Sequence, residues 1–158
     1  MTSMSDMSDT PGTDLPDDPA HEPAHDDGRP RPKREGLAGE YYAWLGQGEL
    51  RFQRCGGCAT WRHLPRPICP HCHSLEWSWE RSAGRGRVFT WTVTHRALHP
   101  YFAEVPYAQV LVQMDEGPRV LSWVVDVEPD DLAFDLPVEV QFAQVGDTTL
   151  PVFVRGDR

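Results

Sequence analysis

Four cysteines arranged as two pairs constrain this chain more than any other feature. The pairs are Cys55-Gly-Gly-Cys58 and Cys69-Pro-His-Cys72; ten residues separate them, and they contain all 4 cysteines of the 158 residues. Each Cys-x-x-Cys segment bends into a tight knuckle that directs both thiolates to one point, and two knuckles complete a tetrahedral cage of sulfur atoms. Such a cage leaves no position for water or substrate. The sequence therefore predicts a structural zinc ion held by Cys55, Cys58, Cys69 and Cys72.

Other uses of four cysteines are open at this stage. An iron site of the rubredoxin type has nearly the same ligand spacing, and residue types alone do not separate it from zinc. A redox Cys-x-x-Cys normally occurs singly near a βαβ pattern, and two disulfides would need an oxidising compartment. His63, His71 and His73 are close to the cysteines in the sequence. With four thiolates available, we expect these histidines to face solvent or to support the ligands.

The first 35 residues have the composition of a segment outside any fold. They contain no aromatic residue, six of the 15 prolines, and nine acidic against four basic residues. Such a segment buries too little apolar surface to offset the entropy of ordering it. It also lacks the apolar core of a signal peptide, and no run in the chain is long enough to span a membrane. We expect residues 1–35 to be a disordered acidic tail on a cytoplasmic protein.

Charge is distributed unevenly over the rest of the chain. Residues 50–87 carry seven arginines and two glutamates, whereas residues 88–158 carry four arginines and eleven acids. The formal net charge of −9 argues against a general nucleic-acid binder, because a phosphate backbone requires a cationic surface. The segment around the cysteines nevertheless predicts a local basic face. Arg62 and Arg66 are its candidates for contact with phosphates or with an acidic partner.

The sequence predicts a helix and a ribbon of short strands in residues 36–83. Leu37, Tyr41, Trp44 and Leu45 recur at helical spacing, and two glycines follow them. This helix is expected either to cover the ribbon or to present a face to a partner. Ribbon strands are expected on both sides of the first knuckle and after the second, at residues 50–54, 60–63 and 77–81. The turn-rich residues 82–87 form the expected boundary of this region.

From Arg87 onward the apolar residues alternate with a period of two, which indicates β-strands. Leu132 and Phe134, in the long connection before the fourth strand, are expected to plug one end of a barrel. A meander of three strands followed by a longer crossover predicts a five-stranded OB-fold barrel in residues 84–158, with an SH3-like barrel or a small sandwich as alternatives. The five strands are expected at residues 87–95, 108–114, 121–127, 138–142 and 150–154.

No catalytic set is visible in the sequence. It lacks the G-x-S-x-G and H-E-x-x-H motifs and the glycine patterns of nucleotide-binding loops, and the knuckles use every thiol. One loop, residues 95–107, is rich in aromatic and titratable side chains, and long loops of this kind often contact ligands or partners. Its candidates for such contacts are His95, His99, Tyr101 and Phe102. His95 with Glu104 would be the available acid/base pair.

Several motifs occur in an order that resembles a known family. They are W-L-x-x-G-E-L, F-Q-R-C-G-G-C, P-R-P-I-C-P-H-C, S-A-G-R-G-R-V, T-H-R-x-x-H-P-x-F, D-E-G-P-R-V-L-S and T-L-P-V-F, between Leu37 and Arg155. Together they resemble the zinc-ribbon/OB-fold accessory proteins associated with acyl-CoA enzymes, the domain of unknown function 35 (DUF35) type. The acidic tail is a departure from this pattern.

The resemblance implies a mostly β protein, in which a helix and a rubredoxin-like zinc ribbon precede an OB-fold barrel. It implies a non-catalytic subunit that works beside a thiolase-fold enzyme, such as a lipid-transfer-protein-like aldolase acting on steroid side-chain acyl-CoA thioesters. A heterotetramer is the expected assembly, with the acyl-CoA shared between subunits and with Arg62 and Arg66 near its phosphates. Two rival functions are a single-stranded nucleic-acid module and a stand-alone acyl-CoA enzyme.

Overall fold

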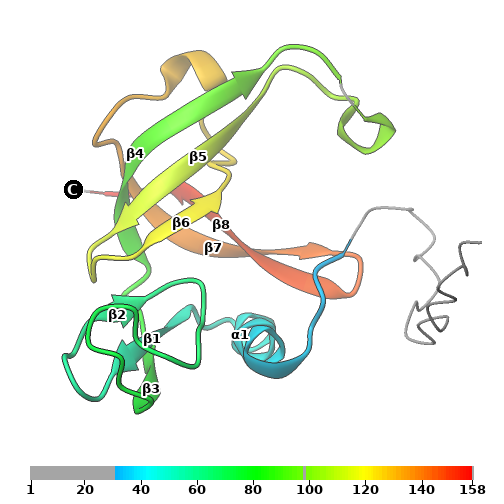
Figure 1. The fold of residues 1–158 in the computed structure, drawn as a ribbon. Helices are drawn as coiled ribbons and strands as arrows, with labels where there is room; N and C mark the ends of the chain where they lie inside the picture. Colours follow the sequence, from blue (N-terminus) through cyan, green and yellow to red (C-terminus); the bar gives the residue numbers. More distant parts are fainter. Residues whose placement is uncertain (1–30, 98, 158) are drawn as a thin grey trace, which may run out of the picture.

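The computed structural model describes residues 31–97 and 99–157, which form two β-sheets and one α-helix (Figure 1). The smaller sheet has three strands in the order β2-β1-β3, and the larger has five in the order β6-β5-β4-β7-β8. The helix is α1 (Gly36–Gly46), and the ribbon strands are β1 (Arg51–Cys55), β2 (Trp61–Arg62) and β3 (Trp77–Arg81). The second sheet contains β4 (Arg85–Thr94), β5 (Tyr107–Met114), β6 (Arg119–Ser122), β7 (Pro137–Val145) and β8 (Thr148–Arg155). Two short 3₁₀ helices, η1 (Pro100–Phe102) and η2 (Pro129–Asp131), lie in its connections.

The five-stranded sheet curls until its two outer strands approach each other. Beyond the end of β6, the Phe153 N–H donates to the Trp123 carbonyl at 2.8 Å, and the Val125 N–H donates to the Phe153 carbonyl at 2.9 Å. These bonds form a parallel bridge between Val124 and Phe153. The result is the nearly closed five-stranded barrel expected of an OB-fold, which confirms the predicted fold class.

Three details of the predicted barrel are wrong. The third strand was expected to reach Val127, but β6 ends at Ser122 because the chain then crosses to β8. The first strand starts earlier than expected, at Arg85, inside the predicted turn-rich joint. Gly86 permits this start, since a Cβ atom there would lie 2.6 Å from the Gln113 carbonyl oxygen of β5. Of the two predicted plugs, Leu132 is buried, but Phe134 is 68 % exposed, and its ring packs against Trp91 on the outside.

The barrel has an apolar core built from alternate residues of its strands. Burial of these side chains removes apolar surface from water, which is the main force that holds a small barrel together. The fully or almost fully buried members are Val88, Val110, Val112, Met114, Val120, Val138 and Phe153.

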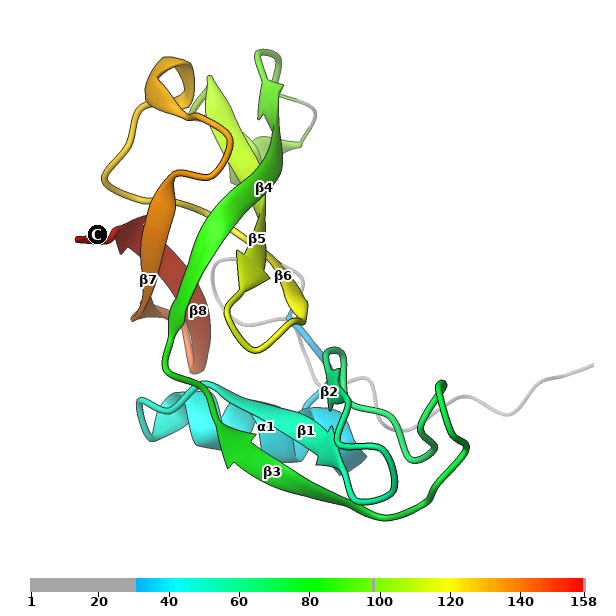
Figure 2. The same cartoon turned by 90° about the vertical axis from the view of Figure 1, so that its left-hand side faces the viewer.

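Helix α1 lies against the ribbon and touches the barrel as well. Its buried residues are Tyr41 and Leu45, and it contacts both β1 and β8. Tyr41 stacks with Trp79 of β3 at 6.4 Å, and the Trp79 indole N–H donates to the Glu40 carboxylate at 2.7 Å. Figure 2 shows α1 and the ribbon together beneath the barrel. The apolar face of the helix therefore covers its own chain. Within residues 31–97 and 99–157, no helix combines the length and the apolar character needed to cross a membrane.

A carboxylate from the barrel joins the two sheets. Glu116, in the turn between β5 and β6, accepts hydrogen bonds from the Ser82 hydroxyl at 2.9 Å and from the Ala83 N–H at 2.7 Å. The Ser82 N–H in turn donates to the Leu50 carbonyl at 2.9 Å, before β1. The boundary expected near residue 83 stays a prediction, but the connection there is hydrogen-bonded on both sides.

The end of the predicted tail is attached to the barrel. Arg31 donates to the Val145 carbonyl at 3.0 Å and to the Asp147 carboxylate at 2.7 Å, and Arg34 binds the same carboxylate at 2.6 Å. These contacts hold the segment before α1 on the turn between β7 and β8. The rest of the predicted disordered tail, residues 1–30, lies outside the described residues.

Candidate functional site

The two cysteine knuckles have the same backbone hydrogen bonds. In the first, the Ala59 N–H donates to the Cys55 carbonyl; in the second, the His73 N–H donates to the Cys69 carbonyl, both at 2.9 Å. The residue after each pair adopts a left-handed conformation, with φ of 58° at Ala59 and 61° at His73. The two segments thus adopt one local fold, although they share only the cysteines and their spacing.

The four sulfur atoms are brought together at distances that fit a metal ion. The Sγ atoms of Cys55 and Cys72 are 3.5 Å apart, those of Cys58 and Cys69 are 3.7 Å apart, and all four lie within 4.8 Å of one another. A zinc ion bound by four thiolates at ~2.3 Å separates the sulfurs by about 3.8 Å, so the donor set and its size both fit zinc. The predicted ligands therefore converge on one centre.

Glycine at position 57 allows the knuckles to approach this closely. A Cβ atom at Gly57 would lie 3.1 Å from the Ser74 Cβ and 3.3 Å from the Cys72 sulfur. The first knuckle therefore packs directly against the second, and a larger residue would push the two pairs of thiolates apart.

The electrostatics of the four thiols also favour a bound cation. Hydrogen bonds from the Thr60 side chain and backbone lower the pKa of Cys58 to about 5. At Cys72 a backbone hydrogen bond to Ser74 favours the thiolate, but contacts with Cys58 and Cys55 outweigh it and raise the pKa of Cys72 to about 12. Four sulfurs this close become thiolates together only when a bound cation offsets their mutual repulsion.

The two arginines predicted on the basic face occupy different environments. Arg66 is exposed, as predicted, but Arg62 is only 5 % exposed, so its expected place on an open basic face is wrong. The reason is its pairing in the sheet, since Arg62 lies opposite the buried Gln53 on β1. The Arg62 side chain donates to the Arg66 carbonyl at 3.2 Å, beneath the loop that leads to the second knuckle.

His63 is not the solvent-facing or ligand-supporting histidine that the sequence suggested. Its ring packs between Tyr41 of α1 and Phe52 of β1, with ring centroids 5.3 and 5.5 Å away. Burial lowers the pKa of His63 to about 4, so the imidazole is neutral at pH 7. His71 and His73 are exposed, as predicted.

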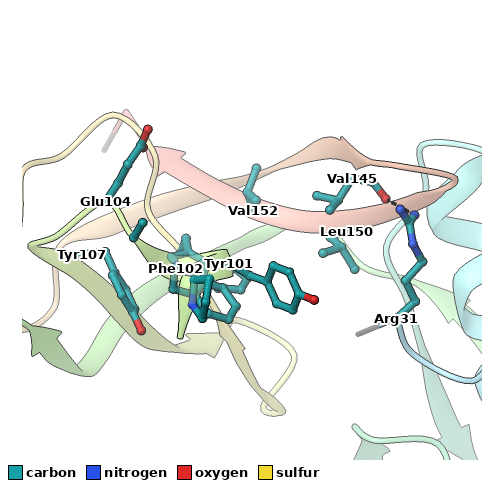
Figure 3. Close-up of a pocket in the computed structure, with 11 residues that line it drawn as sticks. Arg31, Tyr101, Phe102, Glu104, Tyr107, Val145, Leu150 and Val152 are labelled. Carbon is teal, nitrogen blue, oxygen red and sulfur yellow. Dashed lines mark hydrogen bonds between the residues drawn. The ribbon is translucent and has the colours of Figure 1, made fainter. Parts of the chain in front are cut away.

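The aromatic-rich loop, residues 95–107, borders a pocket on the barrel, away from the zinc ribbon. The pocket has a volume of about 670 Å³ and lies between η1 and the hairpin of β7 and β8. Figure 3 shows Tyr101, Phe102 and Tyr107 on one side and Val152 and Leu150 on the other, with Arg31 and Glu104 at opposite ends. Its full lining is Arg31, Pro100, Tyr101, Phe102, Ala103, Glu104, Tyr107, Trp123, Val145, Leu150 and Val152.

The structure separates the predicted contact residues into two groups. Tyr101 and Phe102 line the pocket; His95 and His99 are exposed and do not, although His99 stacks with Tyr101 at 4.4 Å. The ribbon, which contains Arg62 and Arg66, lies below the barrel and away from the loop that carries η1 (Figure 1). Sequence reasoning missed Trp123, Leu150 and Arg31 as lining residues, because they come from three distant segments and carry no shared motif.

Comparisons with known proteins agree with this architecture. A family model described as the ChsH2 rubredoxin-like zinc ribbon domain matches residues 45–78, and one described as the ChsH2 C-terminal OB-fold domain matches residues 79–143. A "DUF35 domain-containing scaffold protein" from Pyrococcus furiosus is 36% identical over 93 residues, which are 57% of this chain and 68% of that protein. The chain belongs to the DUF35 family.

Membership in this family identifies the four-cysteine centre as the metal site of a rubredoxin-like zinc ribbon. The resemblance noted from the motifs is thereby confirmed, as is the expectation of a structural zinc ion.

Two further similarities are to a chain of an aldolase and to a subunit named as a hydratase. A chain of a solved structure described as "Ltp2-ChsH2(DUF35) aldolase" superposes with a TM-score of 0.73 and 36% sequence identity, covering 79% of this chain and 98% of that chain. A "Probable enoyl-CoA hydratase alpha subunit" from Thermomonospora curvata is 38% identical over 126 residues, which are 79% of this chain. The chain spans only 39% of the length of that relative.

Proposed function

We propose that this chain is a non-catalytic accessory subunit of a thiolase-fold enzyme that acts on acyl-CoA thioesters. In this role it supports the folding of the enzyme or helps to form its acyl-CoA site, and the partner carries the catalytic residues. The observation that carries the proposal is the similarity to a chain of the Ltp2-ChsH2(DUF35) aldolase, which extends over 98% of that chain. A heterotetramer around a dimeric enzyme is the assembly we expect.

The chemistry of the described residues supports a binding role. The cysteines are used by the zinc centre, whose four ligands leave no open position for substrate. The pocket near η1 is lined mainly by aromatic and aliphatic side chains, with single charged residues at its ends. Such a lining suits an apolar group or a partner side chain better than acid/base chemistry. Of the two arginines predicted to contact an acyl-CoA phosphate, exposed Arg66 is the one that stays available within this proposal.

A role as part of a hydratase is the second candidate, favoured by the name of the Thermomonospora curvata relative. Because this chain corresponds to only 39% of that protein, hydratase activity is expected from the unmatched part. Addition of water to an enoyl-CoA by the purified chain alone would support a catalytic role for the chain and contradict the accessory role.

Affinity capture of the tagged chain from its native extract tests the proposal. We expect a thiolase-fold protein to co-elute in stoichiometric amount, identified by mass spectrometry. Phe102→Ala should reduce the captured amount or the turnover of the complex, because Phe102 is an exposed aromatic residue of the pocket loop. Phe134→Ala is the matched control, since Phe134 is exposed but outside the pocket. Capture of single-stranded nucleic acid instead of an enzyme would overturn the proposal in favour of an OB-fold nucleic-acid module.

A further inference from the structure

The ribbon contains a buried arginine, Arg62, that forms no ion pair with a carboxylate of the described residues. Arg62 is 5 % exposed, and its Nε and Nη2 atoms are buried without a hydrogen-bond partner among the described residues. The Nε2 atom of fully buried Gln53 is in the same condition. Buried polar groups in folded proteins are nearly always hydrogen-bonded, so three such atoms in one place need an explanation.

These atoms belong to one small cluster. Arg62 and Gln53 are directly opposite each other on β2 and β1, so their side chains share one face of the sheet. Both bind Arg66, which lies in the loop between β2 and the second knuckle that covers them (the covering loop). The Gln53 Oε1 accepts from the Arg66 N–H at 2.8 Å, and the Arg62 Nη1 donates to the Arg66 carbonyl at 3.2 Å. The remaining polar atoms of the cluster are all donors. What is missing is therefore an acceptor.

An anion fits the place of this acceptor, because a buried guanidinium without an ion-pair partner is strongly unfavourable. No carboxylate of the described residues lies within salt-bridge distance of Arg62, whereas Arg51 and Arg81 of the same ribbon both pair with Glu49. The zinc ion with four thiolates carries a net negative charge that acts through space, but no sulfur accepts a bond from Nε or Nη2 among these residues. The Nε and Nη2 atoms form the edge of guanidinium that binds both oxygens of a carboxylate.

We propose that Arg62 and Gln53 form a carboxylate-binding site that an aspartate or glutamate of the partner enzyme completes on assembly. This inference rests on the proposed function, because it assumes that the ribbon docks on a partner. The covering loop must shift, or the Arg62 side chain must rotate outward, for the carboxylate to reach it. In the free subunit the buried Arg62 guanidinium thus lacks a carboxylate partner, which is unfavourable. Docking supplies that carboxylate.

The surface around the cluster supports a protein as the source of the carboxylate. Three large apolar residues are exposed close to the second knuckle, with Leu64 64% exposed, Ile68 50% and Leu75 69%. Leu64 and Ile68 flank Arg66 in the covering loop, and the hydrogen bond from the Cys69 N–H to the Ser74 carbonyl draws the chain near Ile68 and Leu75 together. A partner surface that covers these side chains excludes water from the ion pair, which a free, hydrated phosphate would not do.

The experiment compares four forms of the zinc-loaded chain: wild type, Arg62→Met, Arg62→Lys and Arg81→Met. Arg81 is the matched control, an exposed arginine of the same ribbon whose loss changes the net charge equally. Thermal unfolding of each free chain is measured first. Its affinity for the thiolase-fold protein captured by the wild type is then measured, with and without coenzyme A. We expect Arg62→Met to unfold at or above the midpoint of Arg81→Met and to bind the partner at least about tenfold more weakly.

The remaining outcomes are decisive as well. If the wild type captures no thiolase-fold protein, the proposed function and this inference both fail. If the wild type captures it and Arg62→Met binds it equally well, only the inference fails. A defect seen solely in the presence of coenzyme A would assign the cluster to a phosphate and overturn the carboxylate. If Arg62→Met unfolds at a lower midpoint than Arg81→Met, the Arg62→Lys variant tests the site instead. Weaker binding of the partner by Arg62→Lys at wild-type stability supports the site, and undiminished binding rejects it.

Discussion

The zinc ribbon and the barrel of this protein are stabilised in different ways. In the barrel, alternate strand residues such as Val110, Val112 and Val138 are fully buried, and the sheet nearly closes on itself. In the ribbon, β2 is only two residues long, and large apolar residues such as Leu64 and Leu75 lie on the surface. A metal centre joins the loops of the ribbon where an apolar core is too small to do so. A short segment with a small core can thus hold its loops in a defined conformation by binding a metal ion.

Helix α1 adds apolar side chains to the small core of the ribbon. Tyr41 packs against Trp79 of the ribbon, and the helix contacts both β1 of the ribbon and β8 of the barrel. The ribbon therefore has an apolar core, but the preceding helix supplies one side of that core.

Removal of zinc should produce the largest difference between the two regions. Structural zinc sites contribute an apparent binding free energy of roughly 10–16 kcal/mol to folding. Chelation should therefore abolish the protection of ribbon amides in residues 51–81 while those of β4, β5 and β7 stay protected, as measured by hydrogen exchange with mass spectrometry. Restored protection after zinc is added back is the control. Equal loss of protection in both regions would show that the barrel depends on the ribbon.

Truncation of a barrel residue should give a smaller effect that does not depend on metal. Phe153 is fully buried, and its backbone makes the bonds that close the barrel. Phe153→Ala should lower the free energy of unfolding by about 3–5 kcal/mol, since it removes a large core side chain. Phe134→Ala, at a 68 % exposed position, should change it by less than about 0.5 kcal/mol. Urea unfolding measures both, and similar losses would contradict the assigned core.

The smallest expected effect is a pH dependence that arises in the contact between α1 and the ribbon. Burial lowers the pKa of His63 from 6.5 to about 4, so the folded state binds fewer protons than the unfolded state between these values. The contribution of His63 to stability is complete above pH 6.5 and is lost as the pH falls through 4. Between pH 7.5 and 5.5 the loss should be roughly 1–1.5 kcal/mol.

Urea unfolding at these two pH values checks this expectation. His63→Leu should reduce the loss on acidification, because it removes the group that takes up the proton. His71→Leu is the control, since His71 is exposed and should leave the loss unchanged. An identical pH dependence in wild type and His63→Leu would assign the loss to the zinc thiolates instead.

Local patterns in the sequence were sufficient for a large part of the structure. The cysteine spacing predicted both knuckles and all four converging ligands, because a Cys-x-x-Cys turn is decided within a few residues. Alternating apolar residues predicted β5, β7 and β8 to within a few residues, and the helical spacing after Gly36 predicted α1. The meander of three strands and the longer crossover then predicted an OB-fold barrel, which the family resemblance also implied.

The errors and omissions concern contacts between distant segments. Where β6 ends depends on the approach of Phe153, which is far away in the sequence. The burial of Arg62 follows from its register with Gln53 and from the loop above them. In the sequence alone, an arginine within a basic segment suggests a surface position. The pocket is formed by residues as far apart as Arg31, Trp123 and Val152, which no local pattern connects.

By itself, the sequence determined the zinc ligands and the type of most elements, because both depend on the spacing of a few neighbouring residues. Only the tertiary structure decided which arginine is buried without a carboxylate partner among the described residues and which aromatic residues line a pocket. Those properties depend on strand register and on the packing of the ribbon, helix and barrel, where each side chain's surroundings come from residues remote in the chain.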